Sequence, residues 1–320
     1  SAASDVYKRQ VEAAGARLEA ANEQLQAARL SVAAETARVY LALRGAQHEQ
    51  QALNAAVEAS RSSTGLVRQQ FAAGAVPEAA VAEAEASLAS VEAQLPMIEA
   101  QVRTAALSLG ILLGELPESE LGLADSSADY VTLVPLPVGE RADILRRRPD
   151  VRAAERQVAA ATADIGVATA ELFPKFGITA NAGFESLHTD NFFDSGSQRF
   201  NITPFISWRI FDGGRVRAQI HATEARELRA ALAYEKAVKA ALTDAERALT
   251  RYNLGLAALK HKDIAVTAAR RNYGFAIARY KAGEISLLEL LVAERALRVA
   301  ENSYAQTHTR TATDLVALYK

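Results

Sequence analysis

Residues 238–259 read VKAALTDAERALTRYNLGLAAL, a stretch whose apolar side chains recur at alternating steps of four and three. They are Val238, Leu242, Ala245, Leu249, Tyr252, Leu256 and Leu259. This is the heptad spacing of helices that supercoil around one another, not the 3.6-residue period of a helix on a globular core. The stretch lies within residues 215–280, which contain no proline and only two glycines. We therefore predict a single helix, roughly 100 Å long at about 1.5 Å per residue.

A second long helix is predicted over residues 11–71, which lack proline and are rich in alanine. Alanine favours the helix intrinsically, and its small side chain lets neighbouring helices approach closely. Both helices exceed the usual length in a globular domain. Residues 1–10 differ in composition from this alanine-rich stretch and carry no prediction. The helices alone favour an antiparallel coiled coil or an elongated bundle, so other features must decide.

An internal repeat is one such feature, because an offset of 209 residues places Gly74 on Gly283 without a gap. The same offset also matches Arg38 with Arg247, Arg61 with Arg270, Gly65 with Gly274, Glu85 with Glu294, Leu88 with Leu297 and Glu92 with Glu301. Two unrelated alanine-rich helices would share alanines but not these positions. Each repeat is predicted to be a long helix, a turn closed by a left-handed glycine, and a return helix over residues 77–113 or 286–319.

Between the repeats lie two stretches with the two-residue period of β-strands. Their apolar positions are Phe176, Ile178, Ala180, Ala182 and Phe184, then Phe200, Ile202, Pro204, Ile206, Trp208 and Ile210. A polar loop, residues 188–198, connects them. Strands of about ten residues cross an outer membrane when tilted. Because two strands cannot satisfy their edges in lipid, we predict closure into a barrel with strands from elsewhere; the alternative is a hairpin packed on the helices.

The composition and the motifs argue against several classes of function. A net charge of -2 gives no field that would hold nucleic acid, and the absence of cysteine removes thiolate metal sites and thiol catalysis. The histidines lack metal-ligand spacing; they are His48, His188, His221, His261 and His308. No nucleophilic serine motif or catalytic acid pair is present. We therefore expect no enzyme, no metal and no cofactor.

Three motifs accompany these elements. They are Arg147-Arg148-Pro149-Asp150-Val151, Ala170-Glu171-Leu172-Phe173-Pro174 and Trp208-Arg209-Ile210-Phe211-Asp212-Gly213-Gly214-Arg215. Pro149 suits a first helical turn and Asp150 its positive end, whereas Pro174 would end that helix. Arg146, Arg147 and Arg148 are interpreted as a loop paired locally with Glu140, Asp143 and Asp150 rather than as an anion site.

With the repeated helix pairs, the motifs resemble the TolC-type outer-membrane factor family, most closely its OprM-like and NodT-type efflux lipoproteins. The resemblance extends from Val11 to Lys320. It implies a mainly α-helical fold with two structural repeats: antiparallel coiled-coil helices form a periplasmic α-barrel, and a β-hairpin joins a transmembrane β-barrel. Family members are homotrimers whose subunits each give more than one hairpin to the barrel. We therefore expect a fragment, with a leader, a lipidated cysteine, a helix and a first hairpin before Val11, and a short stretch after Lys320.

By this resemblance the chain divides into five regions. They are first-repeat tunnel helices with a truncated start (1–117), an equatorial loop region (118–148), a helix (149–173), an outer-membrane β-hairpin (174–212) and second-repeat tunnel helices (215–320). Gly74 and Gly283 would mark the helix turns that dock onto an adaptor. Trp208 would lie in an interfacial aromatic girdle.

Channels of this family close where the return helices begin, and they carry acidic rings there. Matching the turn places Glu289 on the first acidic position and Val292 on the second. Tyr280 keeps the closing tyrosine, whereas Ile285 stands at the arginine position and Ala80 at the aspartate position of the first repeat. Tyr280 and Glu289 are thus the pore-aperture residues that the resemblance implies. A solvated surface carboxylate is the alternative for Glu289.

The function implied is that of a passive channel-tunnel subunit in a tripartite RND-type efflux system that exports drugs or other small molecules. The implied location is the outer membrane of a Gram-negative bacterium, with the helices in the periplasm. The implied partners are further copies of the chain in a homotrimer, a periplasmic adaptor (membrane fusion protein), an inner-membrane RND pump and outer-membrane lipid, without nucleic acid. The alternative is a periplasmic coiled-coil adaptor or scaffold without a pore. An adaptor would carry a lipoyl-like β domain, whereas here helical repeats flank a hairpin of membrane length.

Overall fold

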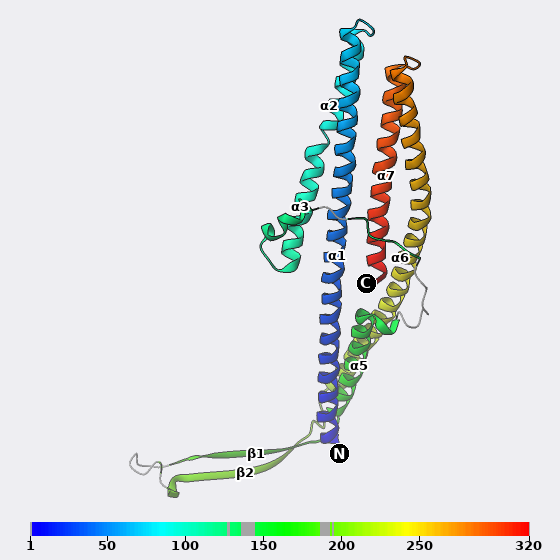
Figure 1. Ribbon diagram of the computed structural model, residues 1–320. Coiled ribbons are helices and arrows are strands. Elements are labelled where there is room, and N and C mark those ends of the chain that lie inside the picture. The colour runs from blue at the N-terminus through cyan, green and yellow to red at the C-terminus, as the bar shows by residue number, and fades with distance from the viewer. Residues whose placement is uncertain (1, 127–128, 136–144, 186–192, 194, 320) are drawn as a thin grey trace. The chain divides into compact units, whose positions relative to one another are not determined.

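The structure is a computed structural model that describes residues 2–126, 129–135, 145–185, 193 and 195–319. The chain divides into two compact units. The strand unit comprises Ser1–Ala27 and Glu140–Leu242, and the turn unit comprises Ala28–Gly139 and Thr243–Lys320. Two helices contribute residues to both units: α1 (Ala2–Ala72) and α6 (Arg215–Lys281), drawn in Figure 1.

Both long helices predicted from the sequence are confirmed. α1 has 71 residues and α6 has 67, and neither is interrupted. The difference lies at the start of the chain, where α1 already includes residues 2–10. These residues contain neither proline nor glycine, the two residue types that most disfavour a helix interior. Among the described residues, no helix combines the length and the apolar character that crossing a bilayer requires.

The most buried stripe of α6 is shifted by one residue from the predicted heptad seam. Tyr252 is fully buried as the seam predicts, but the next most buried positions are Ala241 at 0% and Ala248 at 1% exposure. Gly255 continues that seven-residue spacing, and a β-carbon there would lie 2.5 Å from the hydroxyl oxygen of Thr311 on α7 (Leu287–Tyr319). Small residues therefore line the closest helix approach, because they let two backbones come together.

The turn unit is built from two helical hairpins whose turns lie at the same end of the unit (Figure 1). In one, α1 reverses into α2 (Glu78–Glu92) and α3 (Leu95–Leu113); in the other, α6 reverses into α7. Near the turns, one buried cluster joins the two hairpins. Its members are Val67, Ala84, Ala276, Tyr280, Leu287, Leu290 and Ala293. Farther along the first hairpin, a second cluster packs α1 against α3.

The prediction of one return helix over residues 77–113 is wrong in one respect. The helix is interrupted at Ala93 and Gln94, and α3 begins as a separate helix with Pro96 in its first turn. Proline has no N–H to donate and its ring clashes with the carbonyl four residues earlier, so a continuous helix would be strained here. The second return helix has no proline and is continuous over 33 residues.

Residues 129–135, which follow the 3-10 helix η1 (Pro117–Leu123), are held on the helices of the turn unit. The ring of Tyr130 stacks on His48 of α1 with centroids 3.7 Å apart, and it also contacts His308 and Tyr304 of α7, with centroids 4.4 Å and 5.8 Å away. The Tyr252 hydroxyl of α6 donates a hydrogen bond of 2.7 Å to the Val134 carbonyl. Sequence patterns could not indicate that these two histidines both contact Tyr130, since they lie far apart along the chain.

In the strand unit, α5 (Pro149–Ala170) lies against the first part of α1. Three ion pairs connect the two helices: Arg17 with Asp164 at 2.5 Å, Arg152 with Glu23 at 2.5 Å and Arg156 with Glu19 at 3.2 Å. The predicted start at Pro149 is confirmed. Of the predicted local pairing, the pair between Arg148 and Asp150 is confirmed, at 2.7 Å. Glu140 and Asp143, the other predicted partners, lie outside the described residues.

The β-hairpin comprises β1 (Lys175–Phe184) and β2 (Gln198–Ser207), paired antiparallel with Lys175 opposite Ser207 and Phe184 opposite Gln198. Almost every residue on both faces is exposed; only Gly177 is half-buried, under the ring of Phe205. β2 ends earlier than predicted, so Trp208 and Ile210 follow the strand rather than continue its alternation. Of the predicted loop, residues 188–192 and 194 lie outside the described part of the chain.

Candidate functional site

The two helix turns have the same backbone structure. Gly74 and Gly283 are left-handed, with φ of 72° and 73°. At the first turn, the Gly74 N–H donates to the Phe71 carbonyl at 2.8 Å and the Ala75 N–H to the Gln70 carbonyl at 2.8 Å. The second turn repeats both bonds, from Gly283 to Tyr280 at 3.0 Å and from Glu284 to Arg279 at 2.9 Å. This is the Schellman motif, in which glycine closes a helix and satisfies its last carbonyls.

Gly283 and Gly274 provide a matched test of this turn. Gly283→Ala is expected to lower the free energy of unfolding by about 1–2 kcal/mol, because alanine must adopt a left-handed conformation. Gly274 lies within α6 with a right-handed backbone, so Gly274→Ala is expected to raise it by about 0.5–1 kcal/mol. A β-carbon would meet no atom within 4 Å at either position. Urea unfolding followed by circular dichroism measures both, and equal effects at the two positions would contradict this account of the turn.

Tyr280 lies at the junction of the two hairpins rather than on the surface. Its side chain is 5% exposed, and its hydroxyl donates a hydrogen bond of 2.7 Å to the Gln70 amide oxygen on α1. Burial raises the pKa of Tyr280. Gln70 and Phe71 belong to the last turn of the first long helix, so this bond ties the end of one hairpin to the end of the other. Sequence reasoning identified Tyr280 but not Gln70 as its partner.

Glu289 closes the start of α7. Its carboxylate accepts hydrogen bonds from the Ser286 N–H at 2.8 Å and the Ser286 hydroxyl at 3.0 Å, while the Glu289 N–H donates to that hydroxyl at 3.3 Å. This is a capping box, with serine before the first helical residue and glutamate three positions later. The bonds from Ser286, and more weakly the charge of Arg279, lower the pKa of Glu289, which is exposed. The carboxylate thus has a structural role that the sequence spacing also allows.

The positions beside Glu289 are apolar. Val292 is 60% exposed on α7, whereas Ile285 and Ala80 are half-buried and pack against the cluster that joins the hairpins. At the tip of the junction an inter-hairpin hydrogen bond joins Tyr280 to Gln70, and another joins Tyr273 of α6 to Ser63 of α1. The other side chains of the cluster that joins the hairpins are apolar.

The repeat is visible in the side-chain contacts as well as in the turns. Arg61 pairs with Glu92 at 2.8 Å, and the residues 209 positions later, Arg270 and Glu301, pair at 2.7 Å. A further pair, Arg68 with Glu85 at 2.8 Å, occurs only in the first hairpin. The residue 209 positions after Arg68 is Ile277, so the counterpart of Glu85 has lost its arginine.

That counterpart is Glu294, which is 3% exposed. Neither of its carboxylate oxygens has a hydrogen-bond partner among the described residues. Burial raises the pKa of Glu294; the guanidinium of Arg298 and the hydroxyl of Ser60 oppose this shift but do not cancel it. Tyr273 of α6 also lies close enough to Glu294 for their charges to interact. A buried carboxylate whose desolvation outweighs such interactions favours its protonated form.

Glu294 should make the stability of the protein depend on pH. Burial raises the pKa of Glu294 in the folded state above its ordinary value of 4.5. Its contribution to the free energy of unfolding is therefore fully present below pH 4.5 and is lost as the pH rises through the pKa of the folded state. Glu294→Gln, which keeps the neutral shape, is expected to gain stability over the wild type as pH rises from about 5 to 8. Thermal unfolding across this range measures the difference.

Glu85→Gln is the matched control, since it removes the same carboxylate from the equivalent position of the first repeat. Its exposed ion pair is expected to contribute about 0.2–1 kcal/mol, without a comparable rise across the same pH range. Parallel pH profiles for the two variants would contradict the assignment of a special environment to Glu294.

Trp208 lies in the strand unit, at the point where the hairpin leaves the helices. Its indole N–H donates to the Leu172 carbonyl at 3.1 Å, and the residue is 54% exposed. Leu172 follows the end of α5, so the bond holds the two hairpin connections together. Trp208 is thereby fixed beside a strand end with much of its ring uncovered.

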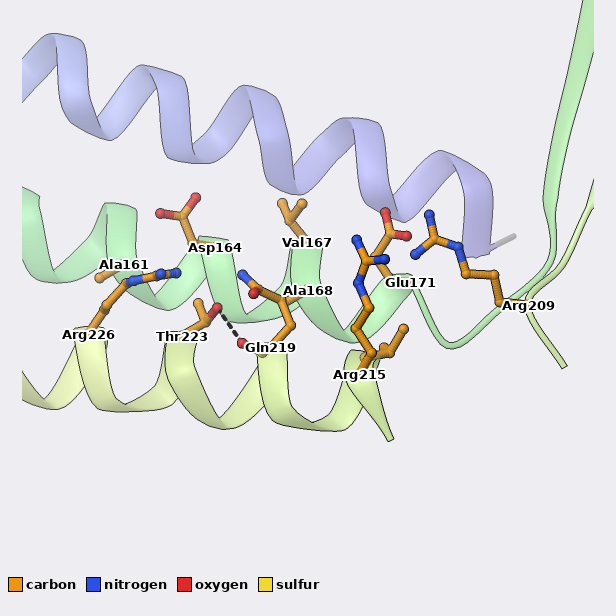
Figure 2. Close-up of a pocket in the computed structure, with 11 residues that line it drawn as sticks. Ala161, Asp164, Val167, Ala168, Glu171, Arg209, Arg215, Gln219, Thr223 and Arg226 are labelled. Atoms are coloured by element: carbon orange, nitrogen blue, oxygen red, sulfur yellow. Dashed lines mark hydrogen bonds between the residues drawn. The ribbon is translucent and has the colours of Figure 1, made fainter. Parts of the chain in front are cut away.

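A cavity of about 480 Å³ opens at the same place, between α5 and α6. Figure 2 shows its side chains, which come from Asp164, Val167 and Ala168 on α5, from Glu171 directly after α5, from Arg215, Gln219, Thr223 and Arg226 on α6, and from Arg209 after β2. Sequence reasoning missed this cavity, because the two helices that form it are more than 40 residues apart along the chain. The described residues contain no cluster of histidine, cysteine or carboxylate side chains able to hold a metal ion.

The sequence matches the family model described as outer membrane efflux protein over residues 4–115 and 141–320. It is 29% identical over 305 residues to outer membrane protein OprJ of Pseudomonas aeruginosa, a match that covers 94% of this chain and 63% of OprJ. Nodulation protein T of Rhizobium leguminosarum bv. trifolii is 32% identical over 305 residues, covering 94% of this chain and 65% of the relative. The chain thus spans less than two thirds of the length of these relatives.

Solved structures are similar over nearly the whole chain. The outer-membrane channel OprN superposes with a TM-score of 0.91 at 35% identity, covering 98% of this chain and 71% of OprN. The outer membrane protein VceC of Vibrio cholerae superposes with a TM-score of 0.87 at 28% identity, covering 98% of this chain and 74% of VceC.

Proposed function

Because this chain belongs to the outer membrane efflux protein family, we propose that it forms part of a channel-tunnel subunit of a tripartite RND-type efflux system. The subunit lies in the outer membrane of a Gram-negative bacterium, with its helices in the periplasm. It provides a passive route for drugs or other small molecules, and the energy comes from an inner-membrane pump. The proposed partners are two more copies of the subunit, a periplasmic adaptor, the pump and outer-membrane lipid.

The observation that carries this proposal is the hairpin of β1 and β2. Each strand has ten residues, a length suited to crossing a membrane when tilted, and nearly all residues on both faces are exposed. Along each outer edge, half of the backbone groups face away from the partner strand. In lipid those groups must be paired by further strands, and symmetric copies of one subunit supply them.

The two helix turns support the proposed tunnel end. They lie at the same end of the turn unit, share one Schellman geometry and are linked by the bond from Tyr280 to Gln70. In a symmetric assembly each exposed Glu289 forms a ring with its copies at this end, and a ring of carboxylates selects cations. Gly74 and Gly283 place the tips that dock onto an adaptor, and Trp208 contributes to the aromatic girdle at the membrane surface.

The alternative, a periplasmic adaptor without a pore, rested on the helices alone. The names of the relatives speak against it, since they describe outer membrane proteins and channels. Nothing in the described residues points to a catalytic function.

Conductance tests the proposed channel. The protein produced from its own gene and added to planar lipid bilayers is expected to give discrete single-channel steps, which disappear after heat denaturation. If a preparation whose circular dichroism spectrum shows folded protein conducts no current, the proposal is contradicted.

Glu289→Gln tests the proposed aperture. Glutamine retains an oxygen for the capping box, so the turn should keep its structure while the ring loses its charge. We expect a smaller reversal potential under a salt gradient, meaning lower preference for cations, and weaker block by divalent cations. Glu235→Gln, which removes an exposed carboxylate paired with Lys239 on α6, is the control. If both variants conduct like the wild type, Glu289 does not line the aperture.

A further inference from the structure

Residues 129–135 contact both helical hairpins of the turn unit, and we call this segment the strap. Its Tyr130 ring touches one histidine from each hairpin. His48 on α1 stacks on the ring with centroids 3.7 Å apart and an interplanar angle of 17°, whereas His308 on α7 lies 4.4 Å away at 52°. The Val131 backbone also forms a hydrogen bond with His308. Two imidazoles on different helices thus hold one end of the strap.

The other end of the strap is attached to α6. There the hydroxyl of Tyr252, a fully buried residue, donates a hydrogen bond of 2.7 Å to the Val134 carbonyl. The strap therefore joins α1 to both helices of the second hairpin. His48 lies roughly 40 Å along α1 from the turn at Gly74, at about 1.5 Å per residue. This connection is thus separate from the cluster that joins the hairpins near their turns.

Little water reaches the two imidazoles. His308 is 8% exposed, and Nε2 of His48 is buried without a hydrogen-bond partner among the described residues. Both side chains line a cavity of about 10 Å³, which has room for one water molecule at most. Protonation would place positive charge here with almost no water to solvate it, which is unfavourable.

Nearby groups do not offset the burial of the imidazoles. Burial is the main cause that lowers the pKa of His48, and the Arg44 guanidinium of α1 adds to it. The Gln51 side chain and the exposed Asp129 carboxylate of the strap oppose this shift without cancelling it. Burial also lowers the pKa of His308 despite its bond to the strap backbone, and a charge on His48 lowers it further. Both imidazoles therefore favour the neutral form while the strap is in place.

The other ionisable groups of this region act on the tyrosines. Burial raises the pKa of Tyr130 to about 12, so it remains a neutral phenol where histidine titrates. Weaker charges act in the same direction, those of Glu49 on α1 and of Tyr304 and Glu301 on α7. Glu301 is paired with Arg270 of α6 at 2.7 Å, and Asp263 of α6 lies near Tyr304.

We propose that the strap is a pH-sensitive connection between the two helical hairpins, held while His48 and His308 are neutral and released when they take up protons. Once the strap is released, water surrounds each imidazole, which then binds a proton at its ordinary pKa of 6.5. The strap is therefore fully held above pH 6.5 and is lost as the pH falls through the lower pKa values of the held state. This property goes beyond the proposed channel function and does not depend on a pore.

The mobility of a spin label on the strap tests the proposal. Residues 1–320 contain no cysteine, and Thr132 is exposed between the two attached ends, so Thr132→Cys provides a labelling site. The protein is produced from its own gene, with any thiol outside these residues replaced by serine. Electron paramagnetic resonance spectra recorded from pH 8 to pH 5 are expected to change from an immobilised to a mobile label, with a midpoint below pH 6.5.

His48→Phe keeps a ring against Tyr130 but removes the titrating group, and no hydrogen bond to Nε2 is lost. Because each histidine contributes its own proton uptake, the pH-dependent change in the logarithm of the mobile-to-immobile ratio should fall to roughly half. His308→Gln retains an amide that can bond with the Val131 backbone. Combined with His48→Phe, it should leave the label immobilised at pH 5.

His261→Gln is the matched control, since His261 is an exposed histidine of α6 in the same unit. It is expected to release the strap like the wild type. An equal loss of the pH response in His48→Phe and His261→Gln, or an unchanged response in His48→Phe, would overturn the proposal. So would a wild-type label that is equally mobile at both pH values. If acid immobilises the label further, attraction between an imidazolium and the Tyr130 ring holds the strap, and the proposal is also overturned.

Discussion

Each outer edge of the β-hairpin presents a row of backbone N–H and C=O groups that the partner strand cannot reach. Within the part of the chain that the structure describes, β1 and β2 pair only with each other, and almost all of their residues are exposed. Water could satisfy such edges, but the apolar residues between them favour lipid, where each unpaired group costs several kcal/mol. The proposed membrane location of the hairpin therefore implies neighbouring strands. In the proposed assembly, further copies of the subunit supply these strands, and the long helices belong to the same assembly.

The duplicated helical hairpins show how one pattern is adapted to two positions. Both copies keep the glycine turn and one ion pair, from Arg61 to Glu92 and from Arg270 to Glu301. The two copies differ at the position of Glu85 and Glu294, next to the cluster that joins the hairpins. Glu294 is buried, and its carboxylate oxygens accept no hydrogen bond from the described residues. Burial raises the pKa of Glu294 in the second hairpin, whereas Glu85 at the equivalent position of the first forms an exposed ion pair with Arg68.

Much of the fold could be predicted because its signals are local or periodic. The mainly helical fold class with a β-hairpin and the family are both confirmed. Gly74 and Gly283 were identified as turns from their place at the end of a helix, and both are left-handed. The break before Pro96 was missed although that residue disfavours a helix interior, since the repeat suggested a continuous copy. Trp208 was placed on a strand by alternation alone, but the strand ends one residue earlier.

The contacts of the site were harder to predict, since they depend on which helix faces meet. Nothing local to Glu294 distinguishes it from Glu85, and its burial arises from residues on α1 and α6 such as Ser60 and Tyr273. Tyr280 was found through its turn, but its bond to Gln70 spans 210 positions of sequence. Heptad spacing indicated the correct side of α6, yet small residues such as Ala248 determined where the helices approach most closely.

The requirement for neighbouring strands is tested most directly by amide hydrogen exchange on protein reconstituted in lipid, read residue by residue across Lys175–Phe184 and Gln198–Ser207. If further strands close the hairpin into a barrel, every amide in both strands should be protected, including those on the outer edges. Protection at alternate residues only, with the outward-facing amides exchanging as fast as in a free chain, would show an open hairpin and contradict the account.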